Sequence, residues 1–424
     1  MKREEFEAQV AEDGSLVIPP QLVKQYGLEQ GTKIRMEKGR SGLQLRLPVT
    51  HLAKVYIEPT NRCNLECLTC IRNTWDEPLG EMSSAAFARI VKDLSLFSSP
   101  PDVLFGGLGE PLAHPDIIDM VSQVKALGSS VELITNGTLL NKDLSKQLIE
   151  AGLDMLWISL DGATPESFKD VRLGAALPEV LENIASFRQA RWGTRYSSYF
   201  VDYHLKPQIG IVFVAMKRNI ADLPALLRLG NRLGTRRFLV TNLLPYTAEM
   251  HDEIIYAQAL TDAIYTPSPW GFSLELPKLD INASTRETLF QLMHSGYPLN
   301  FAGAELGKGN RRCPFIEKGA LAIGWDGDVS PCLPLLHDHS TYLNERERSL
   351  RHYTVGNLNH RNLPDLWNTR EYLSFRERVQ QFDFSPCVLC SGCDLSKTNE
   401  EDCFGSPFPA CGGCLWAQGV IQCP

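Results

Sequence analysis

Short apolar runs alternate with longer amphipathic segments through the first part of this 424-residue chain. Strands are expected at Lys54–Glu58, Asp102–Phe105, Ser130–Thr135, Met155–Leu160, Gln208–Ala215 and Arg237–Thr241. Helices are expected between them, at Ser83–Phe97, Pro115–Leu127, Asn141–Ala151, Pro178–Arg188 and Ile220–Leu233. Strands that alternate with helices form parallel sheets, so the pattern predicts an α/β fold with a partial (β/α)₆ TIM-like barrel. A full eight-unit barrel is the alternative, but two further strands are not evident.

Three cysteines follow the first expected strand, in the run Cys63-Asn-Leu-Glu-Cys67-Leu-Thr-Cys70. Reactive groups of barrel proteins lie on loops at the carboxyl ends of the strands, so these thiols are expected at the barrel mouth. A [4Fe–4S] cluster normally takes four cysteine ligands. Three thiolates this close can hold three irons and leave the fourth open to another ligand. A three-thiolate zinc site and unconnected core cysteines are the alternatives.

Glycine-bearing polar motifs follow the next three expected strands. They are Gly106-Gly107-Leu108-Gly109-Glu110-Pro111, Thr135-Asn136-Gly137 and Ser159-Leu160-Asp161-Gly162. Glycine allows a ligand to approach the backbone closely. The motifs therefore indicate a small-molecule site at the barrel mouth. Plain turns are the alternative, because Asn-Gly and Asp-Gly are common turn pairs.

This combination resembles the radical S-adenosylmethionine (radical SAM) enzymes. In that family the open iron binds SAM, and an electron from the cluster cleaves it to a 5′-deoxyadenosyl radical. The resemblance implies this reaction here, with Cys63, Cys67 and Cys70 as cluster ligands. It implies SAM contacts from Gly107, Gly109, Glu110, Thr135, Asn136, Ser159, Asp161 and Arg172. One departure is Thr69, which stands where the family usually has a large apolar residue beside the adenine, so the stacking contact is in doubt and a backbone contact is expected.

Nine further cysteines lie in the last part of the chain, at Cys313, Cys332, Cys387, Cys390, Cys393, Cys403, Cys411, Cys414 and Cys423. This region is rich in Cys, Gly and Pro, and it is expected to bury little apolar surface and to need metal to fold. It resembles the SPASM-type extension, which implies one or two auxiliary [4Fe–4S] clusters that draw on these cysteines. A zinc ribbon built from the two Cys-x₂-Cys pairs at Cys390 and Cys411 is the alternative. His337 and His339 are expected in a solvated loop and are left out of the site.

The rest of the chain divides into smaller predicted parts. Residues 1–48 resemble the AbrB-like swapped-hairpin module, which implies dimerisation or substrate docking, with DNA binding as the weaker alternative. Residues 49–245 form the predicted barrel and residues 311–424 the auxiliary-cluster domain. Residues 246–310 are expected to be a connector or lid, with helical stretches at 246–263 and 285–294 and a glycine-rich segment at 302–310.

Composition narrows the class of protein. The net charge of −8 is unlike that of a general nucleic-acid binder, which is usually basic. No secretory signal and no run of 18 apolar residues are evident, so a cytoplasmic protein without a membrane span is expected. Twelve cysteines without an export signal indicate metal or redox chemistry in a reducing compartment.

The chain as a whole resembles the cofactor-modifying maturases that accompany tungsten-containing aldehyde ferredoxin oxidoreductases. The resemblance includes the ending Cys411-Gly-Gly-Cys-Leu-Trp-Ala-Gln-Gly-Val-Ile-Gln-Cys423-Pro424. It implies a protein, peptide or pterin-cofactor substrate and a low-potential electron donor, ferredoxin or flavodoxin. A maturase for a ribosomally made peptide and a metal-binding DNA regulator are the alternatives.

Overall fold

A computed structural model provides the structure, which describes most of the chain. The described residues are 6–424 except 27, 29–31, 33, 40–41, 193–204, 236, 258, 261–273, 278, 281–282, 286, 289–290, 292–298, 302–311, 344–345, 386 and 390–393. Cys390, Cys393 and the predicted glycine-rich segment 302–310 therefore lie outside the described residues, as does most of the helical stretch expected at 285–294.

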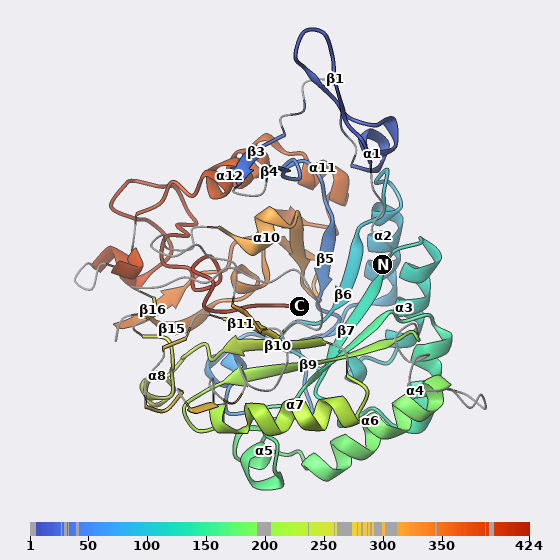
Figure 1. Ribbon diagram of the computed structural model, residues 1–424, viewed down its shortest axis with the longest axis vertical. Coiled ribbons are helices and arrows are strands. Elements are labelled where there is room, and N and C mark those ends of the chain that lie inside the picture. Colours follow the sequence, from blue (N-terminus) through green and yellow to red (C-terminus); the bar gives the residue numbers. More distant parts are fainter. Residues whose placement is uncertain are drawn as a thin grey trace.

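A parallel sheet forms the centre of the molecule (Figure 1). Its strands are β5 (Lys54–Ile57), β6 (Asp102–Phe105), β7 (Val131–Thr135), β8 (Met155–Ser159), β9 (Gln208–Ala215) and β10 (Arg237–Asn242). They lie side by side in sequence order, and each neighbouring pair is parallel. These are the six strands predicted from the sequence, displaced by at most one residue at either end.

The sheet continues beyond these six strands at both edges. On one side β11 (Leu274–Leu276) pairs parallel to β10, and β12 (Leu299–Phe301) pairs parallel to β11. On the other side β13 (Ala320–Ile323) pairs parallel to β5 and is followed by the antiparallel strands β14 (Asp328–Ser330) and β17 (Gly356–Asn357). Neither β11 nor β12 is predicted from the sequence, because three residues are too few to show a period. The domain boundaries stay a prediction.

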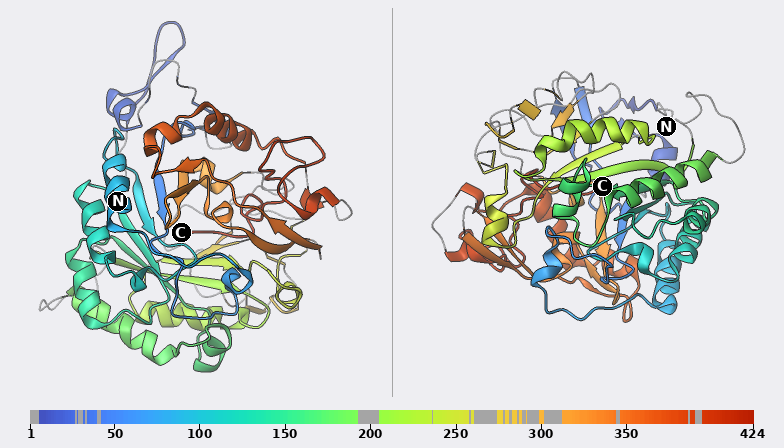
Figure 2. Two further views of the ribbon diagram at one scale, coloured as in Figure 1. Left: turned by 180° about the vertical axis from the view of Figure 1, so that it is seen from behind. Right: turned by 90° about the horizontal axis from the view of Figure 1, so that it is seen from below.

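Helices cover the outer face of the sheet (Figures 1 and 2). They are α2 (Ser84–Leu94), α3 (Ile117–Ala126), α4 (Lys142–Glu150), α5 (Pro165–Val171), α6 (Leu177–Trp192) and α7 (Leu223–Arg232). Local sequence sets their ends: the Ser83 hydroxyl accepts a hydrogen bond from the Ala86 amide at 3.1 Å. Gly128 and Gly152 end α3 and α4 with φ of +86°, in the left-handed region that favours glycine.

The N-terminal segment forms two small hairpins and a short helix. They are β1 (Gln9–Val10) with β2 (Leu16–Val17), α1 (Pro20–Gln25), and β3 (Met36–Gly39) with β4 (Gly42–Leu45). Val10 is 71% exposed and Met36 is 57% exposed. Arg35 binds Glu317 at 3.2 Å and so ties the second hairpin to the C-terminal region. Dimerisation through this module stays a prediction.

The C-terminal region packs against the open side of the sheet and contains mostly short elements. They are α8 (Ala248–Asp252), α10 (Pro314–Glu317), β15 (His339–Leu343), β16 (Arg346–Leu350), α11 (Leu363–Trp367) and α12 (Arg370–Gln381). Single 3₁₀ turns lie at Ile71–Thr74, Pro111–Ala113, Ile220–Asp222, Leu333–Leu335, Cys387–Leu389 and Asp394–Lys397. Both views in Figure 2 place the C-terminal end in the middle of the molecule, where the Tyr56 hydroxyl donates to the Pro424 carbonyl at 2.7 Å. Among the described helices, none is both long and apolar enough to span a bilayer.

Candidate active site

A cavity of about 330 Å³ opens at the carboxyl ends of the parallel strands. Ten of the eleven predicted residues around the SAM site line it: Cys63, Cys67, Cys70, Gly107, Gly109, Glu110, Thr135, Asn136, Ser159 and Arg172. Thr69 lines it as well. The eleventh, Asp161, is fully buried behind the wall. The fold thus collects side chains from loops after four strands into one space, as expected from the parallel order.

Each of the three clustered cysteines accepts a hydrogen bond from a different nitrogen. Arg72 Nε donates to Cys70 Sγ at 3.3 Å, and Arg172 Nη1 donates to Cys67 Sγ at 3.6 Å. Asn136 Nδ2 lies 3.9 Å from Cys63 Sγ. Burial raises the pKa of Cys63 and Cys67, while the two arginines act in the opposite direction. Donors to sulfur stabilise thiolates, so this arrangement fits cysteines that hold an iron–sulfur cluster.

Glu110 connects the loops that follow β6 and β7. Its carboxylate accepts from the Thr135 hydroxyl at 2.7 Å and from the Asn136 amide at 2.8 Å. It also accepts from the Leu112 amide at 3.0 Å. Burial raises its pKa, and these donors oppose the rise. Glu110 and Thr135 therefore hold the cavity wall together, which is a positioning role beside the SAM contact that the sequence predicts.

The glycines after β6 are needed for close packing. A Cβ atom at Gly107 would lie 2.5 Å from the Glu58 carboxylate, and one at Gly109 would lie 2.0 Å from the Thr60 carbonyl. Real Cβ atoms essentially never come that close to other heavy atoms. These positions accept only glycine because the loop after β6 lies directly on the loop after β5, which carries the cysteines.

Asp161 and Arg172 form a buried ion pair behind the cysteines. Their side chains meet at 2.6 Å, and Asp161 also accepts from the Val214 amide at 2.8 Å. Although burial alone would lower the pKa of Arg172, its pairing with Asp161 and Cys67 raises it. The guanidinium therefore stays charged beside the cluster loop, and Asp161 fixes its position.

His337 and His339 are not in a solvated loop, so that sequence-based interpretation is wrong. Each side chain is 6% exposed, and both line the cavity. His337 Nε2 bonds Glu58 at 2.8 Å, and its Nδ1 bonds Glu77 at 2.6 Å. The loop is buried because the His337 imidazole binds two carboxylates, those of Glu58, directly after β5, and of Glu77. One signal for this contact was available in the sequence: Glu58 is a charged residue at the end of a buried strand, and a buried charge needs a partner.

Replacing His337 with glutamine should destabilise the fold most at low pH. Although burial alone would lower the pKa of His337, hydrogen bonds to Glu58 and Glu77 raise it to about 10. The stabilisation is therefore complete below pH 6.5, the ordinary value for histidine, and declines until it is lost above about 10. Breaking such a buried pair costs about 3 kcal/mol. Urea unfolding at pH 6, 8 and 10 should show a difference from wild type that shrinks as pH rises.

The control for this prediction is His352→Gln. His352 pairs with Asp338 at 2.9 Å, but its side chain is 52% exposed. Exposed pairs contribute roughly 1 kcal/mol or less, so this variant should unfold nearly like wild type. A His337 effect that persists undiminished at pH 10 would contradict the charged state of the imidazole.

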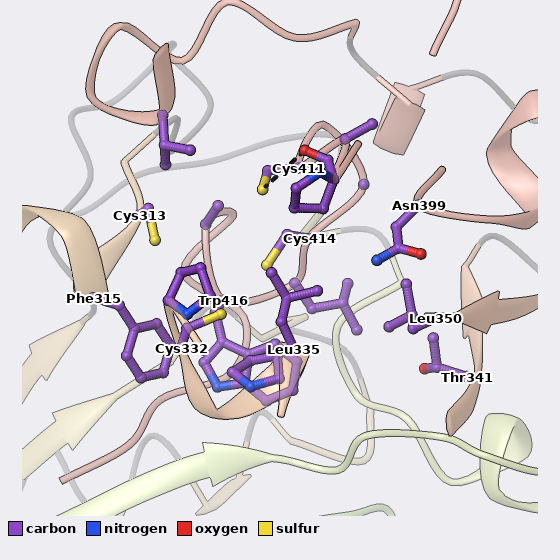
Figure 3. Close-up of a pocket in the computed structure, with 18 of the residues that line it drawn as sticks. Cys313, Phe315, Cys332, Leu335, Thr341, Leu350, Asn399, Cys411, Cys414 and Trp416 are labelled. Carbon is purple, nitrogen blue, oxygen red and sulfur yellow. Dashed lines mark hydrogen bonds between the residues drawn. The ribbon is translucent and has the colours of Figure 1, made fainter. Parts of the chain in front are cut away.

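Four C-terminal cysteines surround a second, smaller space of about 50 Å³. Figure 3 shows the sulfur atoms of Cys313, Cys332, Cys411 and Cys414 around it. Burial raises the pKa of Cys313 to about 12, and it raises the pKa of the other three as well. A thiol becomes a metal ligand once metal binding removes its proton, which offsets a raised pKa of this kind. The four thiols share one space, and a common cluster there stays a prediction, since no group of three His, Cys, Asp or Glu side chains among the described residues is placed to hold a single metal ion.

Close packing also explains the Cys411-Gly-Gly-Cys414 sequence. A Cβ atom at Gly412 would lie 2.0 Å from the Ser385 carbonyl, and one at Gly413 would lie 2.5 Å from Arg348 Nη1. The buried Arg348 donates to the Gly413 carbonyl at 2.8 Å. The two glycines let the loop turn both thiols toward Cys313 and Cys332.

The remaining predicted metal ligands lie elsewhere. Cys423 lines the large cavity, where its sulfur accepts from Trp416 Nε1 at 3.3 Å. Cys387 is half-buried and Cys403 is exposed. Asp402 accepts from the Ser385 amide at 3.0 Å and so links the loops of Cys387 and Cys403. Cys390 and Cys393 lie outside the described residues, so the zinc-ribbon pairing with Cys411 and Cys414 stays untested.

Comparison with known protein families matches two parts of the chain. Residues 57–204 match the radical SAM superfamily, and residues 313–394 match the SPASM iron–sulfur cluster-binding domain. The chain is 33% identical over 377 residues to the tungsten-containing aldehyde ferredoxin oxidoreductase cofactor-modifying protein of Pyrococcus furiosus. That alignment covers 87% of this chain and 96% of the relative. Fe-coproporphyrin III synthase of Methanosarcina barkeri is 24% identical, with 84% of each chain covered.

Solved structures share the fold. Streptococcus suis SuiB bound to the precursor peptide SuiA matches with a TM-score of 0.54 and 15% identity, over 80% of this chain and 70% of SuiB. Native anSMEcpe with bound AdoMet matches with a TM-score of 0.53 and 17% identity, over 81% of this chain and 88% of that protein. The chain is therefore a radical SAM enzyme with a SPASM iron–sulfur domain, and it belongs to the family of the tungsten-containing aldehyde ferredoxin oxidoreductase cofactor-modifying protein.

Proposed function

We propose that this enzyme modifies a cofactor or cofactor precursor during maturation of a tungsten-containing aldehyde oxidoreductase. The relative that shares 33% identity over nearly its whole length is named for that role. The observation that carries the proposal is that the three-cysteine loop and the C-terminal region line one and the same cavity, because a small substrate can enter there beside the cluster loop. Two other relatives, both from Methanosarcina barkeri, are named Fe-coproporphyrin III synthase and AdoMet-dependent heme synthase, so their names also describe the synthesis of a cofactor or its precursor.

The proposed SAM site uses the side chains that line the first part of the cavity. When bound at Cys63, Cys67 and Cys70, the cluster supplies the electron that cleaves SAM to methionine and a 5′-deoxyadenosyl radical. Ser159, Asn136 and Arg172 offer polar groups to the ribose and carboxylate of SAM. Gly107 and Gly109 expose their backbone to SAM, and Thr69 offers a backbone contact for its adenine. The loops joined by Glu110 keep these groups in place and exclude water.

Two auxiliary clusters are proposed in the C-terminal region. The first draws on Cys313, Cys332, Cys411 and Cys414, which share the smaller space. The second draws on Cys387, Cys390, Cys393 and Cys403, and the Asp402 link between the Cys387 and Cys403 loops supports that pairing. Cys423 is then the spare thiol. A ferredoxin or flavodoxin is the proposed electron donor, as a low-potential cluster requires.

The test uses the aldehyde oxidoreductase isolated from cells that lack this chain. Incubation with the reconstituted enzyme, SAM and a reductant should release 5′-deoxyadenosine above the substrate-free level and change the mass of the extracted pterin cofactor. The oxidoreductase polypeptide should keep its mass. A mass change in the polypeptide, or in a small peptide encoded beside this chain, would instead support the peptide-modifying alternative.

A further inference from the structure

Arg72 places its guanidinium inside the loop that carries the three cysteines. The residue lies in the 3₁₀ turn Ile71–Thr74, directly after Cys70, and it lines the large cavity. Its Nε donates to the Cys70 sulfur at 3.3 Å, its Nη1 to the Asn61 carbonyl at 3.3 Å and its Nη2 to the Leu65 carbonyl at 3.0 Å. These acceptors come from the start, the middle and the end of the loop. One side chain therefore holds the loop together around its cysteines.

The charge of Arg72 has sulfur atoms as its partners. Within the described part of the chain, its acceptors are the Cys70 sulfur and two uncharged carbonyls. The groups whose charge acts on it most strongly are the side chains of Cys70, Cys63 and Cys67. An arginine side chain is always protonated in proteins, so the guanidinium keeps a full positive charge. A half-buried cation in this position is stabilised when the three cysteines are thiolates.

A second arginine near the loop is in a different electrostatic position. Arg172 Nη1 donates to Cys67 Sγ at 3.6 Å, but its Nη2 lies 2.6 Å from the Asp161 carboxylate. That negative charge offsets part of the effect of Arg172 on the sulfur. The charge of Arg72 acts on its sulfur without an offset of this kind.

Other contacts keep the loop in place when Arg72 is replaced. Asn73 Nδ2 donates to the Cys67 carbonyl at 3.0 Å. The Leu68 amide donates to the Val171 carbonyl at 2.9 Å. A variant at Arg72 should therefore keep the three thiols together, and its main effect should be the loss of a charge and a hydrogen bond at sulfur.

The reduction potential of an iron–sulfur cluster depends on its net charge and on hydrogen bonds to its sulfurs. Reduction adds one negative charge, so a cation that donates to a ligand sulfur stabilises the reduced form more than the oxidised form. Such a cation raises the reduction potential. We propose that Arg72 is a positioning residue that raises the reduction potential of the cluster bound by Cys63, Cys67 and Cys70.

This proposal rests on the cluster site of the proposed function and names the residue that lets a low-potential carrier reduce it. The step is the transfer of one electron from the reduced ferredoxin or flavodoxin, which is oxidised, to the cluster, which is reduced. No bond forms or breaks, and no proton moves. The readout is therefore a potential, which is measured without substrate.

The test is a redox titration of the reconstituted enzyme followed by electron paramagnetic resonance, in which the signal of this cluster is the one that Cys67→Ala lacks. Arg72→Gln should lower its midpoint potential by about 60 mV or more, a tenfold change in the ratio of reduced to oxidised cluster. Arg72→Lys keeps a charge but loses the planar fork, so its potential should lie between the other two. A potential in Arg72→Gln at or above that of wild type, or equal potentials in both variants, would overturn the proposal.

The matched control is Arg62→Gln, which removes a positive charge from the same loop. The Arg62 side chain is 54% exposed, lies 3.7 Å from Glu81 and donates to the Leu79 carbonyl at 3.3 Å. Because its partners are a carboxylate and a carbonyl, this variant should keep the wild-type potential. An equal fall in Arg62→Gln would show a general effect of net charge and would overturn the specific role of Arg72.

Iron content separates this proposal from the proposed function. All the arginine variants should bind as much iron as wild type, because the three cysteines remain. Equal iron in wild type and Cys67→Ala would overturn both proposals, since the loop would then hold no cluster. A wild type that binds the cluster and cleaves SAM, with a potential that Arg72→Gln leaves unchanged, would overturn the role of Arg72 alone.

Discussion

Replacing Cys67 with alanine should reduce 5′-deoxyadenosine release from SAM to the level of an enzyme-free control. Cys67 is one of only three ligands available in its loop, so its loss leaves two thiols for a cluster that needs at least three. Bound iron should fall by about four atoms per chain. The measurement is anaerobic reconstitution with iron and sulfide, followed by iron analysis and chromatography after addition of dithionite and SAM.

The matched control for this variant lies in the same loop. Thr74→Ala removes the hydroxyl of an exposed residue, which bonds the Ile71 carbonyl at 2.9 Å and does not line the cavity. It should retain the release measured for wild type. Undiminished release by Cys67→Ala would show that the cluster is held by other residues, and the assignment of the three-cysteine loop would then be wrong.

Replacing Cys332 with alanine should remove one auxiliary cluster and spare the first. Cys332 is buried and is one of four cysteines that line the smaller space, far along the chain from the SAM loop. Bound iron should fall by about four atoms per chain while SAM cleavage continues. Thermal unfolding should begin at a lower temperature, because a metal site in so small a domain contributes directly to folding.

Cys423→Ala is the matched control for Cys332→Ala. Cys423 is half-buried, lines the large cavity and bonds Trp416. Its removal should leave the iron content unchanged. If Cys423→Ala loses iron and Cys332→Ala does not, the ligand set of the first auxiliary cluster is wrong. Stoichiometric zinc in place of iron in the purified protein would also contradict the cluster assignment.

The central sheet could be predicted because its signals are local. Each strand from β5 to β10 is a run of mostly buried and mostly apolar residues, and the helices between them carry their own caps, such as Ser83 and Gly128. The order of a parallel sheet then places the loops after β5 to β8 at one edge. This is why ten predicted site residues meet in one cavity although they come from four separate loops.

The short strands and the histidine pair could not be predicted in the same way. Strands β11 and β12 have three residues each, and their pairing depends on the sheet edge that β10 provides. A solvated loop was expected because His337, Asp338 and His339 are three polar residues in a row. Its partners are Glu58 and Glu77, 279 and 260 residues away along the chain, and no local pattern reports such a contact.

The sequence by itself determined the parallel α/β sheet, the three-cysteine loop at its mouth and a cysteine-rich C-terminal region, because these depend on residues close together in the chain. Only the tertiary structure decided that Cys313, Cys332, Cys411 and Cys414 share one space, and it decided that His337 and His339 are buried in the wall of the large cavity. Both outcomes depend on contacts between residues far apart in sequence. Such contacts are set by how the C-terminal region packs on the open side of the sheet.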